Sequence, residues 1–444
     1  MRIAGRHPGL RLITAATLFL LPLLLPGRVE AQLPAPRELA SEAARLLQEL
    51  AQLRGLPTAG PPPRVAVRSR EERRRFIMGE LRRKFSPARL EAERRGLIAW
   101  GLIPRDFDLG GFLTDLVLEQ AAAYYDPIGK VMVLANWLSP EAQREALAHE
   151  LVHVLQDRQM DLDRFLHPTP GKGDEVLARQ ALIEGEAVAL TLDWALRRHG
   201  QDLGKLPDVI ALQKAIVTSS TGPVLGRAPR FLRTALTFPY AQGLGFVHQF
   251  RRRHGWAELS RLYHDPPRSS AQILHPERYF DRRQDPLPVS LPDLAPALGP
   301  DPRRLLDDEV GEFAFTEILR EFLGEAETAV GWRGDRYAVW DDARGTPVLV
   351  VLSVWEDEAA ATVFADAYAR LVVKKHGLGA PIERGPAVTT WQAAAEGFLV
   401  ERRGREILLL ERAPAPALDR IRGIVWASRP NSRWLRSVSA PRPG

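Results

Sequence analysis

Residues 148–157 read Ala-His-Glu-Leu-Val-His-Val-Leu-Gln-Asp, and the rest of the chain can be interpreted around this stretch. The residues before it predict a helix. Ser139 is a good N-cap and Pro140 suits the first helical position, so we expect a helix from Ser139 to about Met160.

His149 and His153 are four residues apart on this helix, so both imidazoles project from one face and can reach one ion. Zinc takes neutral imidazole nitrogens readily, and a site with three protein ligands keeps a fourth position for a water whose pKa falls to about 7. Glu150 lies beside them. Held off the metal, its carboxylate could take the proton of that water, so we predict that Glu150 is a general base.

The alternative is that these polar residues fall on an ordinary helix by chance. Burying two imidazoles and a carboxylate without partners would be costly. The neighbours nevertheless predict a buried helix, because it is apolar on nearly every side: Ala146, Leu147, Ala148, Leu151, Val152, Val154 and Leu155. We therefore favour a metal site over a metal-free polar network.

A second, largely apolar helix is expected from Asp174 to about His199, and it contains Glu184 and Glu186. An acid inside such a helix needs a cation nearby. The two glutamates are two positions apart and point roughly 200° apart, at about 100° per residue. Only one of them can face the metal, and the spacing leaves open which.

At this point the chain resembles the gluzincin group of metallopeptidases, in which His-Glu-x-x-His supplies two zinc ligands and the base, and a later helix supplies a glutamate. The segment Glu-Gly-Glu-Ala at 184–187 is similar to the Glu-Gly-x-Ala of the aminopeptidase branch, whose ligand is the first glutamate. The resemblance implies that Zn²⁺ is held by His149, His153 and Glu184. Val188 stands where thermolysin-like enzymes place an aspartate that supports the ligands.

A wider set of motifs looks like a family of uncharacterised exported bacterial proteins. It comprises Tyr-Asp-Pro at 125–127, His-Glu-Leu-Val-His-x-Leu-Gln-Asp at 149–157, Glu-Gly-Glu-Ala at 184–187 and Phe-Pro-Tyr-x-x-Gly-x-x-Phe-Val at 238–247. The resemblance covers about residues 66–430 and implies a zincin-like catalytic domain. Asp157 would either orient an imidazole, as carboxylates behind metal ligands do, or be a plain surface acid.

Three residues are candidates for the donor that stabilises a developing oxyanion. Tyr240 belongs to the Phe-Pro-Tyr segment, and a phenol near a polarised carbonyl could donate to its oxygen. His275 and Tyr279 lie in the segment Leu-His-Pro-Glu-Arg-Tyr at 274–279, which resembles a shared segment of the same exported family. A structural role in fixing that loop is the alternative for both.

The first 31 residues predict export. Arginines precede the apolar run from Leu12 to Leu25, and Val-Glu-Ala at 29–31 fits a signal-peptide cleavage site after Ala31. The run is short and contains Pro22, so we expect no stable membrane span after cleavage and a periplasmic or extracellular protein. The chain has no cysteine, which excludes disulfides and thiolate metal sites.

Charge gives no reason to expect a nucleic-acid partner. Half of the formal net charge of +6 lies in residues 1–31, which hold four arginines and one glutamate. The arginine runs near residues 68–75 and 251–253 are typical of solvated helix faces.

We predict an α+β fold with several parts. An N-terminal helix and proline-rich linker, either a spacer or a propeptide, occupy 32–65; the zincin-like domain, mainly helical, covers 66–300. A hairpin of two β-rich runs separated by Asp-Pro-Ile-Gly at 126–129 precedes the metal helix, and its edge would either receive a peptide or be an ordinary sheet edge. A helical connector at 301–330, a small α+β sandwich at 331–428 with its helices on one sheet face, and a disordered tail at 429–444 follow.

The function these features predict is an exported zinc metallopeptidase that hydrolyses a peptide or protein substrate. The alternative is an exported binding or assembly protein on a zincin scaffold with little or no activity. A purely structural zinc is a weaker interpretation, because structural sites are usually closed by four protein ligands. The sequence indicates neither the substrate nor the oligomeric state.

Overall fold

The computed structural model describes residues 36–429 except 57–59, 70, 73, 76–77, 80–85, 121–122, 136–139, 168, 220–221, 325–327 and 343. The predicted signal peptide, the predicted N-cap Ser139 and the tail from residue 430 lie outside the described residues. The chain divides into two compact units. The N-terminal unit contains described residues 36–94 and 102–285, and the C-terminal unit contains 95–101 and 286–429.

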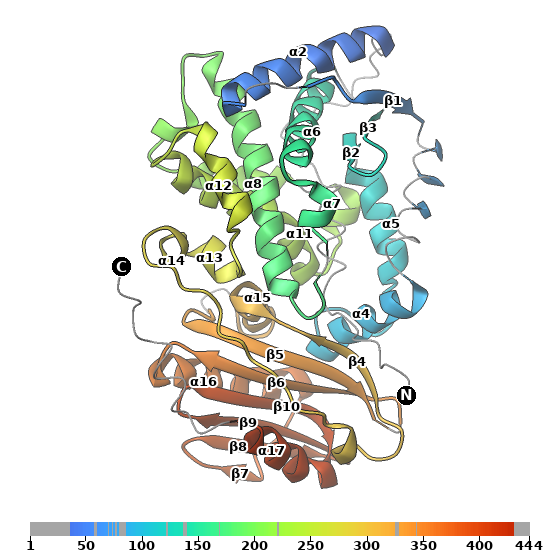
Figure 1. Ribbon diagram of the computed structural model, residues 1–444. Coiled ribbons are helices and arrows are strands. Elements are labelled where there is room, and N and C mark those ends of the chain that lie inside the picture. The colour runs from blue at the N-terminus through green and yellow to red at the C-terminus, as the bar shows by residue number, and fades with distance from the viewer. Residues whose placement is uncertain are drawn as a thin grey trace, which may run out of the picture. The chain divides into compact units, whose positions relative to one another are not determined.

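The N-terminal unit is mainly helical (Figure 1). Its longer helices are α2 (Pro36–Arg54), the first part of α4 (Pro87–Trp100), α5 (Leu109–Gln120), α6 (Pro140–Met160), α8 (Gly173–Arg197), α9 (Ile210–Ser219) and α11 (Arg230–Arg251). The short ones are α7 (Leu162–Phe165), α10 (Pro223–Gly226), α12 (Arg261–His264), α13 (Ser270–Leu274) and α14 (Glu277–Phe280).

A three-stranded sheet accompanies these helices. The predicted hairpin is confirmed: β2 (Ala123–Asp126) pairs antiparallel with β3 (Val131–Ala135). A strand that the sequence analysis did not predict, β1 (Arg64–Arg68), pairs parallel with β3 on its other side. The strand order is β1, β3, β2, so β2 lies at an edge, and α6 packs beside it.

Helices α6, α8 and α11 form the centre of the N-terminal unit. Apolar residues bury α6 and α8 on nearly every side, and α2 packs against both through Leu46, Leu47 and Leu50. At the crossing of α8 and α11, a Cβ atom on Gly185 would lie 2.3 Å from the carbonyl carbon of Gly243. The two helices can approach this closely only because both positions are glycine.

The C-terminal unit is built on a seven-stranded antiparallel sheet with the order β4, β5, β6, β10, β9, β8, β7. The strands are β4 (Arg303–Asp308), β5 (Trp332–Asp341), β6 (Pro347–Trp355), β7 (Glu383–Arg384), β8 (Val388–Ala393), β9 (Glu396–Arg403) and β10 (Glu406–Pro414). Its helices are α15 (Gly311–Leu323), α16 (Glu358–His376) and α17 (Leu418–Ala427). The mixed α+β class predicted for the chain is confirmed.

Helices cover both faces of this sheet, so the prediction of helices on one face is wrong. On one face, Trp355 of β6 stacks on Phe364 of α16, and Phe315 of α15 packs against both rings. On the other face, Val350 and its neighbours pack against α17 and the extended segment before β4. Alternate residues of β6 point to opposite sides of the sheet, and both sides are apolar, which requires two covering layers.

The helical connector predicted at 301–330 is also corrected. Residues 303–308 form strand β4, which pairs with β5 as the first strand of the sheet. Of the described residues in this range, only 311–323 are helical. The aromatic residues Trp332, Tyr337, Trp340 and Trp355 of the C-terminal unit are all buried. Among the described residues, no helix combines the length and the apolar character needed to cross a membrane.

Candidate metal centre

Helix α6 brings His149, Glu150 and His153 into the interior of the N-terminal unit. Each of the three side chains belongs to a residue that is at most 4% exposed. The four-residue spacing places the two imidazoles on one face, with ring centroids 4.8 Å apart and the rings nearly perpendicular. Two ring nitrogens therefore point at one region beside the helix.

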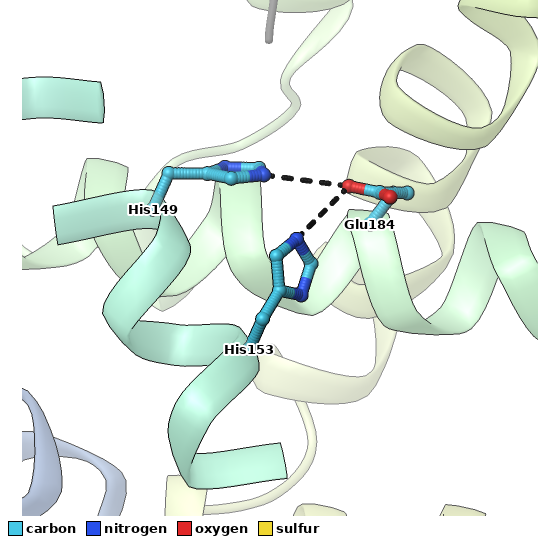
Figure 2. A group of neighbouring side chains, drawn as sticks. All are labelled: His149, His153 and Glu184. Atoms are coloured by element: carbon cyan, nitrogen blue, oxygen red, sulfur yellow. Dashed lines mark ion pairs between the residues drawn. The ribbon is translucent and has the colours of Figure 1, made fainter. Parts of the chain in front are cut away.

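Helix α8 supplies a carboxylate to the same region. Oε2 of Glu184 lies 3.4 Å from Nε2 of His149 and 3.5 Å from Nε2 of His153 (Figure 2). One ligand atom from each of the three residues lies within 4.8 Å of the others. These are two imidazole nitrogens and one carboxylate oxygen, which is a donor set that zinc accepts.

Glu184 is a buried carboxylate to which no described residue donates a hydrogen bond. The residue is fully buried, and neither of its carboxylate oxygens accepts a hydrogen bond of ordinary geometry from any described residue. A buried carboxylate normally has such donors or a cation. The three residues therefore fit a bound metal ion.

The electrostatics of the group follow from burial and from the attraction between its members. Burial lowers the pKa of His149, against the pull of Glu184. Burial also opposes charge on His153, but the charge of Glu184 outweighs it and raises the pKa of His153 to about 9. Burial would raise the pKa of Glu184, yet His153 and His149 lower it. The carboxylate is thus held as an anion, and without a metal the protonated ring of His153 is the positive charge beside it.

A glutamine fixes the tautomer of His153. Nδ1 of His153 lies 2.7 Å from Oε1 of Gln156. The amide nitrogen of Gln156 donates to the carbonyl of Ile183 and to Oε2 of Glu186, so the oxygen must be the atom that faces the ring. Because that oxygen only accepts, Nδ1 carries the proton, and in the neutral ring Nε2 keeps its lone pair toward Glu184.

Glu186, two residues after Glu184 on α8, pairs with an arginine. Nε of Arg54 donates to Oε1 of Glu186 over 2.6 Å, and the hydroxyl of Tyr263 donates to Oε2. Arg54 ends α2 and is 1% exposed. The two glutamates therefore point to different partners, as the helical geometry required, and Glu184 is the one that lies with the histidines.

Glu150 is held by the edge strand. Its Oε2 accepts a hydrogen bond of 2.7 Å from the backbone N–H of Tyr125 in β2. This bond fixes the carboxylate beside the histidines without involving it in the group of three ligand candidates. The hairpin before the metal helix thus contributes directly to the site.

Asp157 neither orients an imidazole nor lies at the surface, which were the two roles expected of it. It is buried, and its Oδ2 accepts from the hydroxyl of Tyr125 and from Nζ of Lys130, 2.7 and 2.5 Å away. Its Oδ1 accepts from the backbone N–H of Leu162. Asp157 therefore ties the hairpin to α6, and the residue behind an imidazole is Gln156.

The three oxyanion candidates lie in different surroundings. Tyr240 of α11 is buried, and its ring stacks on that of His149 at a centroid distance of 6.3 Å. The hydroxyl of Tyr279 donates to the backbone carbonyl of Asp265 over 2.5 Å. Nδ1 of His275, at the end of α13, lies 3.9 Å from Oε1 of Glu277. Only Tyr240 is placed against a ligand candidate by a described contact.

Sequence reasoning missed Gln156, Arg54 and Tyr263. Gln156 had a signal, because it lies three residues after His153 and so shares its helix face. Arg54 and Tyr263 are 132 and 77 residues from Glu186, and no local pattern connects residues so distant.

Comparison with known proteins identifies part of the chain only. Residues 303–422 match a family model described as a domain of unknown function (DUF8575). This match begins at β4 and ends within α17, so it covers the sheet of the C-terminal unit. No curated protein and no solved structure matches the chain.

Proposed function

We propose that this protein is an exported zinc metallopeptidase of the gluzincin type, with a zincin-like arrangement of α6 and α8. The observation that carries the proposal is Glu184, a fully buried carboxylate that faces Nε2 of two histidines and accepts no hydrogen bond from the described residues. His149, His153 and Glu184 would hold the ion. Export rests on the signal-peptide pattern of residues 1–31.

When bound, zinc would supply a water of lowered pKa and polarise the carbonyl of the scissile bond. The chain's own contribution is to hold and move protons. Glu150 lies next to His149 in α6 and is fixed by the N–H of Tyr125, so it is placed to accept a proton and return it to the leaving amine. It is not one of the three ligand candidates.

Tyr240 is the best placed of the three oxyanion candidates. Its ring stacks on His149, and α11 is brought close to α8 by the paired glycines. Tyr279 has committed its hydroxyl proton to a backbone carbonyl, which counts against that role. A phenol donor at the position of Tyr240 would stabilise the negative charge that develops on the carbonyl oxygen.

The substrate class follows from the sheet. Strand β2 has β3 on one side and no strand on the other among the described residues, and it contacts α6. An extended peptide can pair with such an edge as an added strand. We therefore infer a peptide or protein substrate bound along β2, with its scissile bond near Glu150.

One observation favours a second candidate function. The three ligand candidates and Glu150 are each at most 4% exposed. A centre so deeply buried also suits a metal-containing binding or assembly protein that hydrolyses little. The two candidates differ in turnover and not in metal content.

The test uses the full exported chain, with zinc measured by mass spectrometry and turnover measured on a mixed peptide library. We expect one zinc per chain in the parent. Glu150→Gln should keep zinc and lose turnover by about 10²–10⁴-fold, whereas Glu184→Ala should lose both. Glu175→Ala is the matched control, because Glu175 lies on the same helix and pairs only with Arg179 among the described contacts.

The outcomes separate the candidates. Zinc without turnover in the parent would favour the binding protein. Absence of zinc from the parent, or its retention by Glu184→Ala, would overturn the metal centre itself.

A further inference from the structure

We propose that a buried chain of hydrogen bonds from Arg54 through Glu186 and Gln156 positions the ring of His153. Helix α2, which ends at Arg54, would thereby contribute to metal binding. The inference rests on the proposed zinc site and assigns new positioning residues to it. None of these three residues contacts a ligand atom of the metal centre. They act through Nδ1 of His153, on the side of the ring away from Glu184.

The first step is the contact between Gln156 and His153. Because the amide nitrogen of Gln156 is occupied by two acceptors, its oxygen is forced to face Nδ1 of the ring, 2.7 Å away. This holds the ring plane as well as the tautomer. A rotated amide would place two donors against each other and lose the bond.

The second step is Glu186, which holds Gln156 in that orientation. Its Oε2 accepts from the amide of Gln156, 2.8 Å away, and from the hydroxyl of Tyr263. Glu186 is buried, so its charge must be compensated locally. Without that compensation the carboxylate would not keep this geometry.

The third step is Arg54, which supplies the compensating charge and is itself fixed. Its Nε donates to Glu186, its Nη1 to the carbonyl of Trp256 at 2.6 Å, and its Nη2 to Oγ of Ser260 at 3.1 Å. The hydroxyl of Ser260 in turn donates to Oε1 of Gln159 on α6. The guanidinium thus joins α2, α6 and α8 in one rigid polar connection.

This arrangement performs the task that an aspartate four residues after the ligand performs in the thermolysin-like pattern, a position held here by Val188. Partners behind metal ligands typically contribute 10–100-fold to metal affinity. A connection through four residues from three helices would transmit that contribution to α2. The helix could then not be removed as a propeptide without weakening the centre.

The experiment measures zinc affinity of the full chain by competition with a chelator, together with thermal unfolding of the metal-free chain. We expect Gln156→Leu and Arg54→Met each to weaken zinc binding by about 10–100-fold. The double variant should be no weaker than Gln156→Leu alone, because Arg54 acts through Gln156. Arg54→Lys keeps the charge and should recover most of the affinity.

The matched control is Arg251→Met. Arg251 is also a largely buried arginine of the N-terminal unit, but it lies over the ring of Trp256 and near Asp193, and it makes no described hydrogen bond to His153, Gln156, Glu186 or Arg54. Its described interaction with the chain of hydrogen bonds is the electrostatic repulsion between its charge and that of Arg54. This variant should lower stability and leave zinc affinity unchanged. If Arg54→Met behaves in the same way, with affinity within twofold of the parent, the chain of hydrogen bonds is only structural and the proposal is wrong.

A spectroscopic readout keeps the test decisive if Arg54→Met does not fold. In the zinc-loaded parent, nitrogen NMR should find the proton of His153 on Nδ1, and in Gln156→Leu the Nδ1 proton should lose its hydrogen-bonded shift. An unchanged shift would overturn the proposal. A parent that binds no zinc would instead overturn the proposed function, so the two failures are distinguishable.

Discussion

Replacing Gly185 by alanine should disturb the crossing on which the centre depends. The new Cβ would lie 2.3 Å from the carbonyl carbon and oxygen of Gly243, and ordinary contact begins at 3.4 Å. Since the obstacle is helix backbone, α8 and α11 must separate by roughly 1 Å. Forcing extra atoms into a packed interior typically costs about 1–3 kcal/mol, and a clash with backbone belongs at the upper end of that range. The better helix propensity of alanine returns about 1 kcal/mol at most.

We therefore expect Gly185→Ala to lower the free energy of unfolding of the N-terminal unit by about 2 kcal/mol. For a unit of this size that corresponds to a Tm lower by about 4–8 °C, measured by calorimetry of the full chain. Turnover should fall further, because Glu184 precedes the altered residue and Tyr240 lies on the displaced helix. A misplacement of about 1 Å can cost 10²-fold in rate.

Gly226→Ala is the control, since no atom lies within 4 Å of the Cβ it would add. It should change the stability by no more than about 1 kcal/mol and leave turnover unaltered. If Gly185→Ala unfolds within 1 °C of the parent and keeps its turnover, the helices are not in backbone contact at these glycines and the reasoning is refuted.

Three further predictions concern other buried groups. Burial opposes the charge of Glu411, but Lys375 and neighbouring donors lower its pKa to about 2, so about 3 kcal/mol of stability should be present above pH 4.5 and disappear as the pH falls toward 2. Glu411→Gln should abolish that dependence in acid-unfolding curves. Tyr125→Phe removes the hydroxyl bound to Asp157 and should cost about 1.5 kcal/mol in urea unfolding; an unchanged midpoint would contradict the tether. Trp100→Ala removes a fully buried ring from the C-terminal unit and should cost about 3–5 kcal/mol, seen as a lower calorimetric transition of that unit.

The parts of the fold that the sequence predicted depend on local periodicity. Helix α6 was predictable because its apolar residues, its first proline and its paired histidines lie within one segment. The hairpin β2–β3 was predictable for the same reason, from two β-rich runs around a turn. Strand β1 was missed because its pairing with β3 joins residues 64–68 to 131–135, and a strand of only five residues, Arg-Val-Ala-Val-Arg, gives little signal alone.

The C-terminal unit shows a related limit. A small α+β unit was predicted at 331–428, but periodicity in a strand does not reveal which layer covers each face. Strand β6 is buried on both sides, and that pattern required a second covering layer. Strand β4 was taken as part of a helix because its apolar pair Leu305 and Leu306 fits either structure when read without its partner strand.

Glu184 and Glu186 of α8 are both buried carboxylates, but different groups surround them. This contrast is the strongest argument for a metal. Both are buried, and they are two residues apart on one helix. For Glu186 the chain brings an arginine from another helix, with Tyr263 and Gln156 completing the hydrogen bonds. For Glu184 it brings two imidazoles, one of them with Nδ1 directed at Gln156 so that Nε2 faces the carboxylate. Lone pairs from three side chains directed at one region repel one another unless a proton or a metal ion lies between them. The contrast with Glu186 therefore supports the proposal that the members of this group share a metal ion.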